Sequence, residues 1–340
     1  MAMREIALPE FAVFLAAALC CAALIVLLRP LFARYALARP NARSSHTKPT
    51  PQGGGVAVVL AVVLALGAVG AFAAPERAVL LDVLPLGAAV VILTVVGAVD
   101  DMFAVAVLPR FALQAVAVAL VVLTLPAELR AVPMLPLTIE RAAEMLAGVW
   151  FVNLVNFMDG IDWMAVAETV PITASVFVFA MLGAAPAAAG PVALALAGAM
   201  LGFAPFNRPV AKLFLGDVGS LPIGLILFWL LLTLAGSGHL AAALLLPLYY
   251  VADTTITLFG RIARRERITQ AHRTHFYQVA TARGFSVMAV VALVFAVNIV
   301  LAALAALSVR ASSAAFDIVA LCIGAAVVAA LLVTMRRGNR

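Results

Sequence analysis

The stretch Val90-Val-Ile-Leu-Thr-Val-Val-Gly-Ala-Val99-Asp100-Asp101 decides the fold class, because a strongly apolar run ends abruptly in two adjacent acids. Two further polar clusters, Asn153 to Asp162 and Gly216 to Ser220, also lie beside apolar runs. Carboxylates in such places are costly unless they hold a cation or a substrate. When the apolar runs are counted through, all three clusters come out on one side of a bilayer. They predict a shared site for Mg2+ and phosphate groups at a membrane surface.

The composition excludes an ordinary soluble domain. Of the 340 residues, 66% are hydrophobic and 11% are charged, whereas a soluble domain carries about 25% charged residues. A helical span needs roughly 20 apolar residues, and continuous rather than alternating runs exclude a barrel. The sequence therefore predicts an all-α polytopic membrane protein with one domain over 1–340. The eleven predicted spans, or ten without the short fifth one, are 9–33, 54–74, 79–99, 108–126, 142–157, 163–183, 188–206, 218–236, 240–260, 285–309 and 314–335.

The distribution of Lys and Arg predicts the orientation. With the N-terminus on the periplasmic side, all of the 22 basic residues except Arg4, Arg77, Arg130, Arg141 and Arg310 fall on or beside inward-facing segments. This asymmetry is what the positive-inside rule expects. The net charge of +6 is thus first a topological signal, and it does not imply nucleic acid. We expect a multi-pass protein of the bacterial inner membrane with its polar clusters on the cytoplasmic face.

A glycine-rich segment, His46-Thr-Lys48-Pro-Thr50-Pro-Gln-Gly53-Gly54-Gly55, leads into the second predicted span. Glycine lets backbone N–H groups approach an anion closely, and the following helix N-terminus adds a favourable dipole. Lys48, Thr50, Gly53 and Gly54 are therefore candidate phosphate-binding residues. A Pro/Gly turn beside a topological lysine explains the segment equally well, and the sequence leaves both interpretations open.

The acid pair Asp100 and Asp101 ends the third predicted span. Negative charge at a helix C-terminus opposes the macrodipole, so a bound cation or a cationic partner would relieve it. Solvated acids at headgroup level are the alternative, which suits one Asp better than two. Arg110, on the next span, is a candidate for orienting a phosphate.

The segment Asn153 to Asp162 places Asn156, Asp159 and Asp162 at three-residue intervals after the fifth predicted span. Oxygen ligands of this kind suit Mg2+, which usually binds through one or two carboxylates plus substrate phosphates. Gly160 indicates that the helix breaks here. A polar turn is the alternative, but so many carboxylates and amides in a membrane protein favour function.

The segment from Asn207 to Ser220 combines a carboxylate, Asp217, with two glycines just before an apolar run. An ordinary N-cap would explain Asp217 but leaves Asn207 and the second glycine unexplained. Phe214 is more often a packing residue than a base-stacking platform, although its place beside the acid keeps stacking open.

The last long cytoplasmic loop contains His272-Arg273-Thr-His275 after a run of arginines. The two histidines share a face if the segment is helical, and together with Arg273 they are candidates for binding a diphosphate. Zinc is the weaker interpretation, because no cysteine or third histidine stands nearby. Asp253, inside the ninth predicted span, is an intramembrane acid and hence a functional candidate.

These motifs, in this order, resemble those of the polyprenyl-phosphate N-acetylhexosamine-1-phosphate transferase superfamily. The similarity runs from about Arg43 to Gln278, and five motifs in register are far more specific than any one of them. His272-Arg-Thr-His-Phe-Tyr-Gln278 looks like the O-antigen-initiating glycosyltransferase branch. Members of the muramoyl-pentapeptide branch carry a histidine triplet there.

The resemblance implies transfer of a sugar-1-phosphate from a UDP-N-acetylhexosamine to undecaprenyl phosphate, with UMP leaving. It further implies that Mg2+ is required, with Mn2+ as a substitute ion, and it allows a homodimer. Motif matching places the catalytic centre at Asp100, Asp101, Asn156 and Asp159, the Mg2+ ligand at Asp217, nucleotide positions at Asn207 and Phe214, and diphosphate positions at His272 and His275.

Two departures from the family pattern stand out. Met102 follows the acid pair where related enzymes often have Arg or Lys, and the histidine cluster has only two members. The first departure bears on the lipid-phosphate contacts, and the second on the sugar pocket.

A secondary transporter or a non-catalytic lipid-binding membrane protein is the competing class. Transporter sites tend to lie at the bilayer midplane between structural repeats. Here the acids gather at one face, and the sequence shows no repeat. The pattern therefore favours an enzyme.

Overall fold

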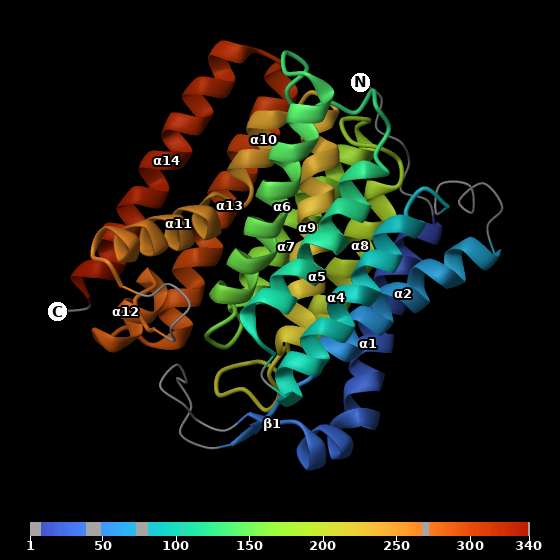
Figure 1. Cartoon of the computed structure of the whole chain (residues 1–340), viewed down its shortest axis with the longest axis vertical. Helices are drawn as coiled ribbons and strands as arrows, with labels where there is room; N and C mark the ends of the chain where they lie inside the picture. The colour runs from blue at the N-terminus through green and yellow to red at the C-terminus, as the bar shows by residue number, and fades with distance from the viewer. Residues whose placement is uncertain (1–7, 39–48, 73–80, 104, 267–271, 339–340) are drawn as a thin grey trace.

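A computed structural model of the chain describes residues 8–38, 49–72, 81–103, 105–266 and 272–338 (Figure 1). Within these ranges the protein is almost entirely helical, as predicted. The helices are α1 (Leu8–Tyr35), α2 (Gly54–Phe72), α4 (Leu84–Phe103), α5 (Val107–Leu123), α6 (Leu137–Met158), α7 (Met164–Met181), α8 (Ala189–Phe203), α9 (Asp217–Gly236), α10 (Leu240–Leu245), α11 (Leu248–Ala263), α12 (Phe276–Ala282), α13 (Val287–Ala311) and α14 (Ala314–Arg337). One antiparallel pair of two-residue strands, β1 (Leu37–Ala38) and β2 (Thr50–Pro51), follows α1.

Six helices in the described ranges are long and apolar enough to cross a membrane. They are α1, α4, α7, α9, α13 and α14. Shorter apolar helices occupy Gly54–Ala68, Val107–Leu123 and Ala189–Phe203. Within the described residues, each predicted span except 240–260 lies mostly on one helix, whereas the count of eleven and the orientation stay predictions.

The structure corrects the ninth predicted span, 240–260. This segment is not one helix, because it is divided at Pro247 into the six-residue α10 and the separate α11. Proline lacks an N–H for the helix ladder and clashes with the preceding turn. Figure 1 shows α11 lying across the bundle, whereas α10 runs along it. A six-residue helix is about 9 Å long, too short to cross a bilayer.

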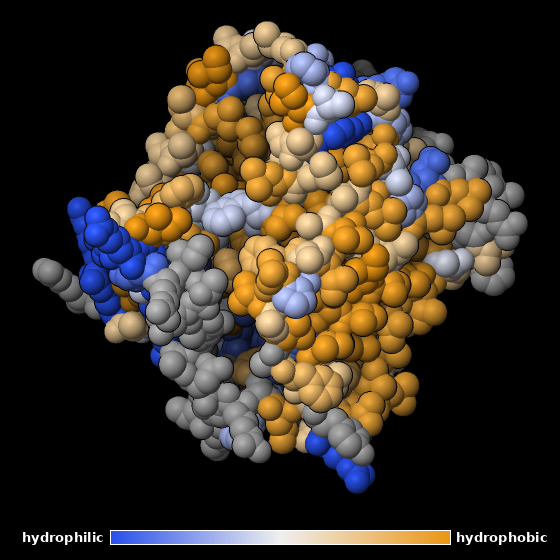
Figure 2. All heavy atoms as spheres, viewed as in Figure 1, coloured by the Kyte–Doolittle hydropathy of each residue, from blue (hydrophilic) through white to orange (hydrophobic). Residues whose placement is uncertain are grey.

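Helix α9 forms the centre of the bundle. All its residues from Val218 to Ala235 are buried, and it packs against α2, α4, α6, α7, α8 and α10. The outer helices α1, α13 and α14 expose large apolar side chains, among them Leu27 and Ile318. Figure 2 shows a broad apolar surface over the middle of the molecule. Exposed apolar surface of this extent suits contact with lipid.

Glycines bring three helices unusually close at one end of α9. A Cβ at Gly55 of α2 would lie 2.2 Å from Gly219 Cα, and a Cβ at Gly97 of α4 would lie 2.2 Å from the Asp217 carbonyl oxygen. Only glycine allows such backbone contacts, which are common between membrane helices. The end of α4 is thereby held against the start of α9.

Candidate active site

Polar side chains converge where α4 and α6 end and α9 begins. Asp101 caps α9: its Oδ1 accepts the Asp217 N–H at 3.0 Å, and its Oδ2 accepts the Val218 N–H at 3.1 Å. Both N–H groups belong to the first turn of the helix, where backbone donors have no acceptor inside the helix. Gly216, with φ of 78°, fits beside this carboxylate, because a Cβ there would lie 2.6 Å from Asp101 Oδ2.

Asp100 points to a different set of donors. Its carboxylate accepts the Val105 N–H at 2.7 Å and an Arg110 N–H at 2.5 Å. The same Arg110 nitrogen lies 3.6 Å from Asp217 Oδ2. Arg110 therefore places a positive charge between Asp100 and Asp217.

Asn156 connects α6 to α9. Its Nδ2 donates to Asp217 Oδ1 and to Ser220 Oγ, both at 2.8 Å. One Asp217 oxygen is thus oriented by Asn156 and the other faces Arg110. Asp217 is the predicted Mg2+ ligand, and these two contacts fix the direction of its carboxylate.

Asp159 follows directly after α6 and is partly exposed. In the described part of the chain, no group donates a hydrogen bond to its carboxylate. Burial raises the pKa of Asp159 well above its ordinary value, and the charges of Asp217, Asp101 and Asp162 raise it further. This carboxyl therefore lies in a field of excess negative charge, which a cation would neutralise.

The donor set fits a divalent cation that shares its coordination with phosphates. The oxygen atoms of Asp217, Asp159 and Asn156 are of the type that Mg2+ prefers. Within the described residues, no group of three or more His, Cys, Asp or Glu side chains is placed to hold a metal by itself. An ion here would need further oxygen ligands, such as substrate phosphates and water.

The glycine-rich segment packs onto the loop before α9. The Gly54 N–H donates to the Phe214 carbonyl and the Gly55 N–H to the Leu215 carbonyl, both at 2.9 Å, while the Phe214 N–H donates to the Pro51 carbonyl. The Gly54 amide is therefore not free to bind an anion, contrary to the anion-loop interpretation. Gly53 and Thr50 are also buried, and Lys48 lies outside the described residues.

Asn207 and Asp162 tie two loops together. Asn207 Oδ1 accepts the Trp163 N–H at 2.7 Å, and its Nδ2 donates to the Leu213 carbonyl at 3.0 Å. Asp162 Oδ2 accepts the Ala211 N–H at 2.9 Å. Both side chains are buried, so in this structure they position the loops that carry Asp159 and the half-buried Phe214.

The histidine motif is divided between an inward and an outward part. His275 is buried, and its Nδ1 lies 3.1 Å from Asp253 Oδ1. Asp253 also accepts the Phe276 N–H at 3.0 Å and the Tyr277 N–H at 3.3 Å, so this acid caps α12. His272 stacks on His275 with ring centroids 5.1 Å apart. Of the three predicted diphosphate residues, His272 and Arg273 retain access to solvent, whereas His275 does not.

Two residues that sequence reasoning missed connect these parts. The Tyr277 hydroxyl donates to the Phe157 carbonyl at 2.9 Å, and a Cβ at Gly160 would lie 2.0 Å from that hydroxyl oxygen. Trp163 begins α7 in a left-handed conformation, with φ of 64°. A tyrosine or a tryptophan alone does not indicate a functional site in a sequence. In the structure, however, Tyr277 contacts Gly160 and Trp163 contacts Asn207.

Comparisons with known proteins find one matching family and several relatives. Residues 83–235 match the family described as glycosyl transferase family 4. A probable undecaprenyl-phosphate N-acetylglucosaminyl 1-phosphate transferase of Bacillus subtilis is 26% identical over 277 residues, covering 77% of this chain and 75% of that protein. A decaprenyl-phosphate N-acetylglucosaminephosphotransferase of Mycobacterium leprae is 31% identical over 224 residues, covering 59% and 55%. The chain thus spans three quarters of the first relative and little more than half of the second.

The fold and the site define a multi-pass membrane protein whose carboxylates gather at one end of a helix bundle. The predicted resemblance to the polyprenyl-phosphate N-acetylhexosamine-1-phosphate transferase superfamily is confirmed. It is a multi-pass protein of the bacterial inner membrane.

Proposed function

We propose that this protein transfers an N-acetylhexosamine-1-phosphate from a UDP-sugar to undecaprenyl phosphate, releasing UMP. The observation that carries the proposal is the convergence of Asp100, Asp101, Asp159 and Asp217 with Asn156 at one end of the bundle. Arg110 is the arginine that pairs with this group. Such an excess of negative charge suits the joining of two phosphate substrates through a divalent cation.

The chemistry needs little from a general base. A phosphomonoester has a second pKa of about 6, so the lipid phosphate is largely dianionic at neutral pH. Its oxygen would attack the β-phosphorus of the UDP-sugar in line. The new bond joins lipid oxygen to β-phosphorus, and the bond from β-phosphorus to the bridging oxygen breaks, so UMP leaves with the electron pair.

The residues of the chain would hold and orient the two anions. Asp217, with its carboxylate fixed by Asn156, would hold Mg2+, which when bound neutralises phosphate charge and stabilises the leaving group. Arg110 would orient a phosphate from its position between Asp100 and Asp217. His272 and Arg273, which lie on the surface beside buried His275, would contact the donor diphosphate.

We further propose that the site faces the cytoplasm, with the N-terminus on the periplasmic side. Arg130 and Arg141, two of the basic residues assigned to outward segments, lie at the N-terminal end of α6, and the site lies at its C-terminal end. This agrees with the positive-inside rule. The counting of spans must treat α10 and α11 as separate helices. Single cysteines at the exposed positions Arg264 and Gly238, in a cysteine-free background, should label only from the cytoplasmic and periplasmic sides respectively.

The donor sugar would be an N-acetylhexosamine, and the names of the relatives in Bacillus and Mycobacterium favour N-acetylglucosamine. The motif His272 to Gln278 supports a role in starting O-antigen or a related envelope polysaccharide. A panel of UDP-sugars, including UDP-N-acetylglucosamine and UDP-N-acetylgalactosamine, would identify the donor.

The decisive experiment measures UMP release by the purified protein. Release should require a UDP-N-acetylhexosamine, a divalent cation (Mg2+, or Mn2+ in its place) and polyprenyl phosphate together. Label in the sugar-proximal β-phosphate should move to the lipid, and label in the α-phosphate should leave with UMP. A transporter would release no UMP. Recovery of the β-label as soluble UDP would mean transfer of the sugar alone and would overturn the proposal.

A further inference from the structure

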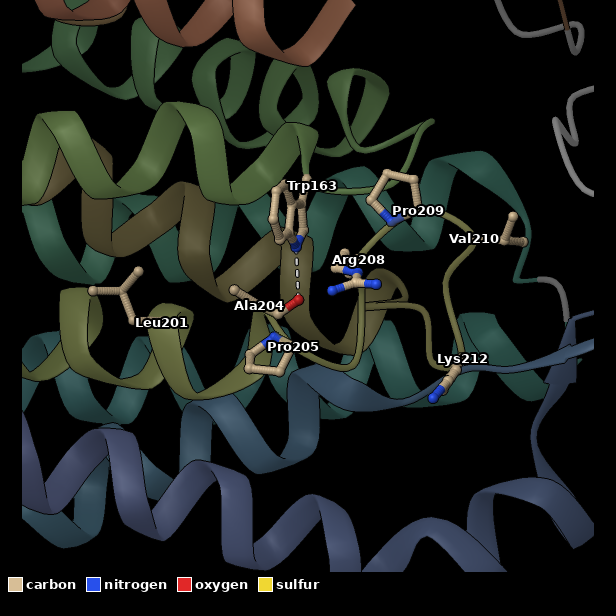
Figure 3. Close-up of a pocket in the computed structure, with 8 residues that line it drawn as sticks. All are labelled: Trp163, Leu201, Ala204, Pro205, Arg208, Pro209, Val210 and Lys212. Atoms are coloured by element: carbon tan, nitrogen blue, oxygen red, sulfur yellow. Dashed lines mark hydrogen bonds between the residues drawn. The ribbon is translucent and has the colours of Figure 1, made fainter. Parts of the chain in front are cut away.

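A pocket of about 650 Å3 lies beside the loops of the site but does not include its carboxylates. It opens between the start of α7, the end of α8 and the loop that follows α8. Its walls include Trp163, Leu201, Pro205, Arg208, Val210 and Lys212 (Figure 3). None of the residues predicted to bind nucleotide, metal or diphosphate lines it.

The pocket lining has an apolar part and a positively charged part. Leu201, Pro205 and Val210 form an apolar part, and all three are exposed. Arg208 and Lys212 add two exposed positive charges, and no carboxylate lines the pocket. A ligand that matches both parts has a negative headgroup and an apolar chain. A soluble nucleotide or a free phosphate would leave the apolar part without a partner.

The position of the pocket in the fold indicates the source of such a ligand. Leu201 lies near the end of the apolar helix α8 and is 41% exposed. The apolar wall continues from it to the half-buried Leu194, two turns earlier on the same face of this otherwise mostly buried helix. Trp163 borders the pocket, with its indole N–H donating to the Ala204 carbonyl at 2.6 Å. Figure 3 shows this indole beside Arg208 and above Pro205. Tryptophan with neighbouring basic residues is typical of the membrane–water interface.

We propose that this pocket binds an anionic phospholipid of the surrounding bilayer, separately from the polyprenyl substrate. Its phosphate lies between Arg208 and Lys212, and its acyl chain follows Leu201 along α8. Basic residues at a membrane surface attract anionic lipids in this way. The proposal does not depend on the reaction that the protein catalyses.

The pocket shares its walls with the site loops. Trp163 donates its backbone N–H to Asn207, and Ala211, between Val210 and Lys212, donates to Asp162. A bound lipid would therefore stabilise the two segments that hold Asp159 and Phe214 in place. Lipid binding and order in the site loops are expected to rise together.

Quenching of tryptophan fluorescence by brominated lipid tests the proposal. Trp150→Phe and Trp229→Phe leave Trp163 as the reporter among the three tryptophans. In nanodiscs, phosphatidylglycerol brominated on its acyl chains should quench Trp163 more strongly than phosphatidylcholine with the same chains. Arg208→Gln with Lys212→Gln should weaken the binding of phosphatidylglycerol about thirtyfold, to the level of phosphatidylcholine.

Arg336→Gln with Arg337→Gln is the matched control, because it removes two exposed charges from the end of α14. This variant should keep the preference for phosphatidylglycerol. Equal quenching by both lipids, or a preference that survives the Arg208 and Lys212 changes, would overturn the proposal.

A second measurement keeps all three tryptophans and so does not depend on the reporter background. In detergent, phosphatidylglycerol should raise the melting temperature of the wild-type protein but not that of the Arg208→Gln, Lys212→Gln variant. The two proteins should melt alike without lipid. Inorganic phosphate should give no stabilisation. If it stabilises as phosphatidylglycerol does, the pocket binds a bare anion, and the lipid assignment is wrong.

Discussion

The two ends of α6 carry polar side chains under opposite electrostatic conditions. At the N-terminal end each acid has its own arginine: Glu140 pairs with Arg130, and Glu144 pairs with Arg141 at 2.8 Å. At the C-terminal end Asp159 shares the space with Asp101 and Asp217 and receives no hydrogen bond from the described residues.

The difference separates structural charge from functional charge. At the N-terminal end the acids and arginines balance one another. Arg141 also donates to the carbonyls of Pro126 and Leu129 and so holds the loop before α6. The other end has more negative charge than Arg110 can balance. Unbalanced carboxylates persist where a ligand supplies the missing charge.

The largest expected effect follows from Asp217→Asn. This change keeps the shape of the side chain but removes the charge that would hold the cation, so kcat should fall about a thousandfold. The melting temperature should stay near that of the wild type, since mutual repulsion of the acids is reduced. The measurement is UMP release over a Mg2+ titration. Full activity at an unchanged Mg2+ optimum would contradict the metal assignment.

Glu144→Gln is the control at the paired end of the same helix. It should leave activity per folded molecule unchanged, because Glu144 lies at the far end of α6 from Asn156 and Asp159. If both substitutions lower kcat alike, the distinction between the two ends fails.

Breaking the paired end should affect stability instead. Arg141→Gln leaves Glu144 buried without its partner and removes two loop contacts, which should cost about 3 kcal/mol of unfolding free energy. Thermal unfolding in detergent measures this loss. Replacing Arg141 and Glu144 together by methionine should recover most of it. A double variant as unstable as Arg141→Gln would show that the loop contacts, not the ion pair, dominate.

Removing divalent cations should make stability depend on pH. A carboxyl whose pKa is raised by folding, such as Asp159, contributes stability that is complete below its unfolded pKa and is lost as pH rises through its folded pKa. In EDTA the melting temperature should therefore fall as pH rises above about 4, the ordinary pKa of an aspartate. Asp159→Asn should flatten this profile, and a flat profile for the wild type would contradict the charge excess.

Mg2+ should restore the stability that is lost in EDTA. At a hundred times its dissociation constant, a ligand that binds only the folded state contributes about 2.7 kcal/mol. The shift should be absent in Asp217→Asn. An equal shift in that variant would place the cation elsewhere.

The smallest expected effect comes from the backbone contact that positions Asp217. Gly97→Ala would place a Cβ 2.2 Å from the Asp217 carbonyl oxygen and should cost about 1–3 kcal/mol through overpacking. Gly87→Ala on the same helix meets nothing within 4 Å and should be neutral or slightly stabilising. Calorimetry of the two variants distinguishes a contact effect from a change in helix propensity.

The sequence predicted the helices well, because each apolar run is long and ends in polar or glycine-rich segments. It failed at 240–260, where Pro247 divides an apolar run. Proline alone gives no warning, since Pro171 and Pro222 lie inside unbroken α7 and α9. The better signal is the polar set Asp253, Thr257 and Arg261, which is buried on one face of α11.

The gathering of the acids was predictable, but their partners were not. Counting spans brings Asp100 and Asp217 to one side of the bilayer. That Asp101 caps α9, that Asn207 binds the Trp163 backbone, and that Asp253 caps α12 depend on tertiary contacts between distant segments. Motif matching assigns such residues to ligands, whereas the structure first shows them holding the backbone that carries the site.

The complete burial of α9 bears on how the protein is made. This helix contains no charged residue after Asp217 and is among the apolar ones, yet the finished molecule shields it from the bilayer by its neighbours. Its apolar side chains therefore serve insertion into the membrane during synthesis, and helices made before and after it enclose it later. The chain must complete at least α10 before α9 has all its neighbours. A chain that ends at Gly236 and is tethered to the stalled ribosome by a linker long enough to clear the exit tunnel should expose an inserted α9 to lipid crosslinkers that no longer reach it in the mature protein.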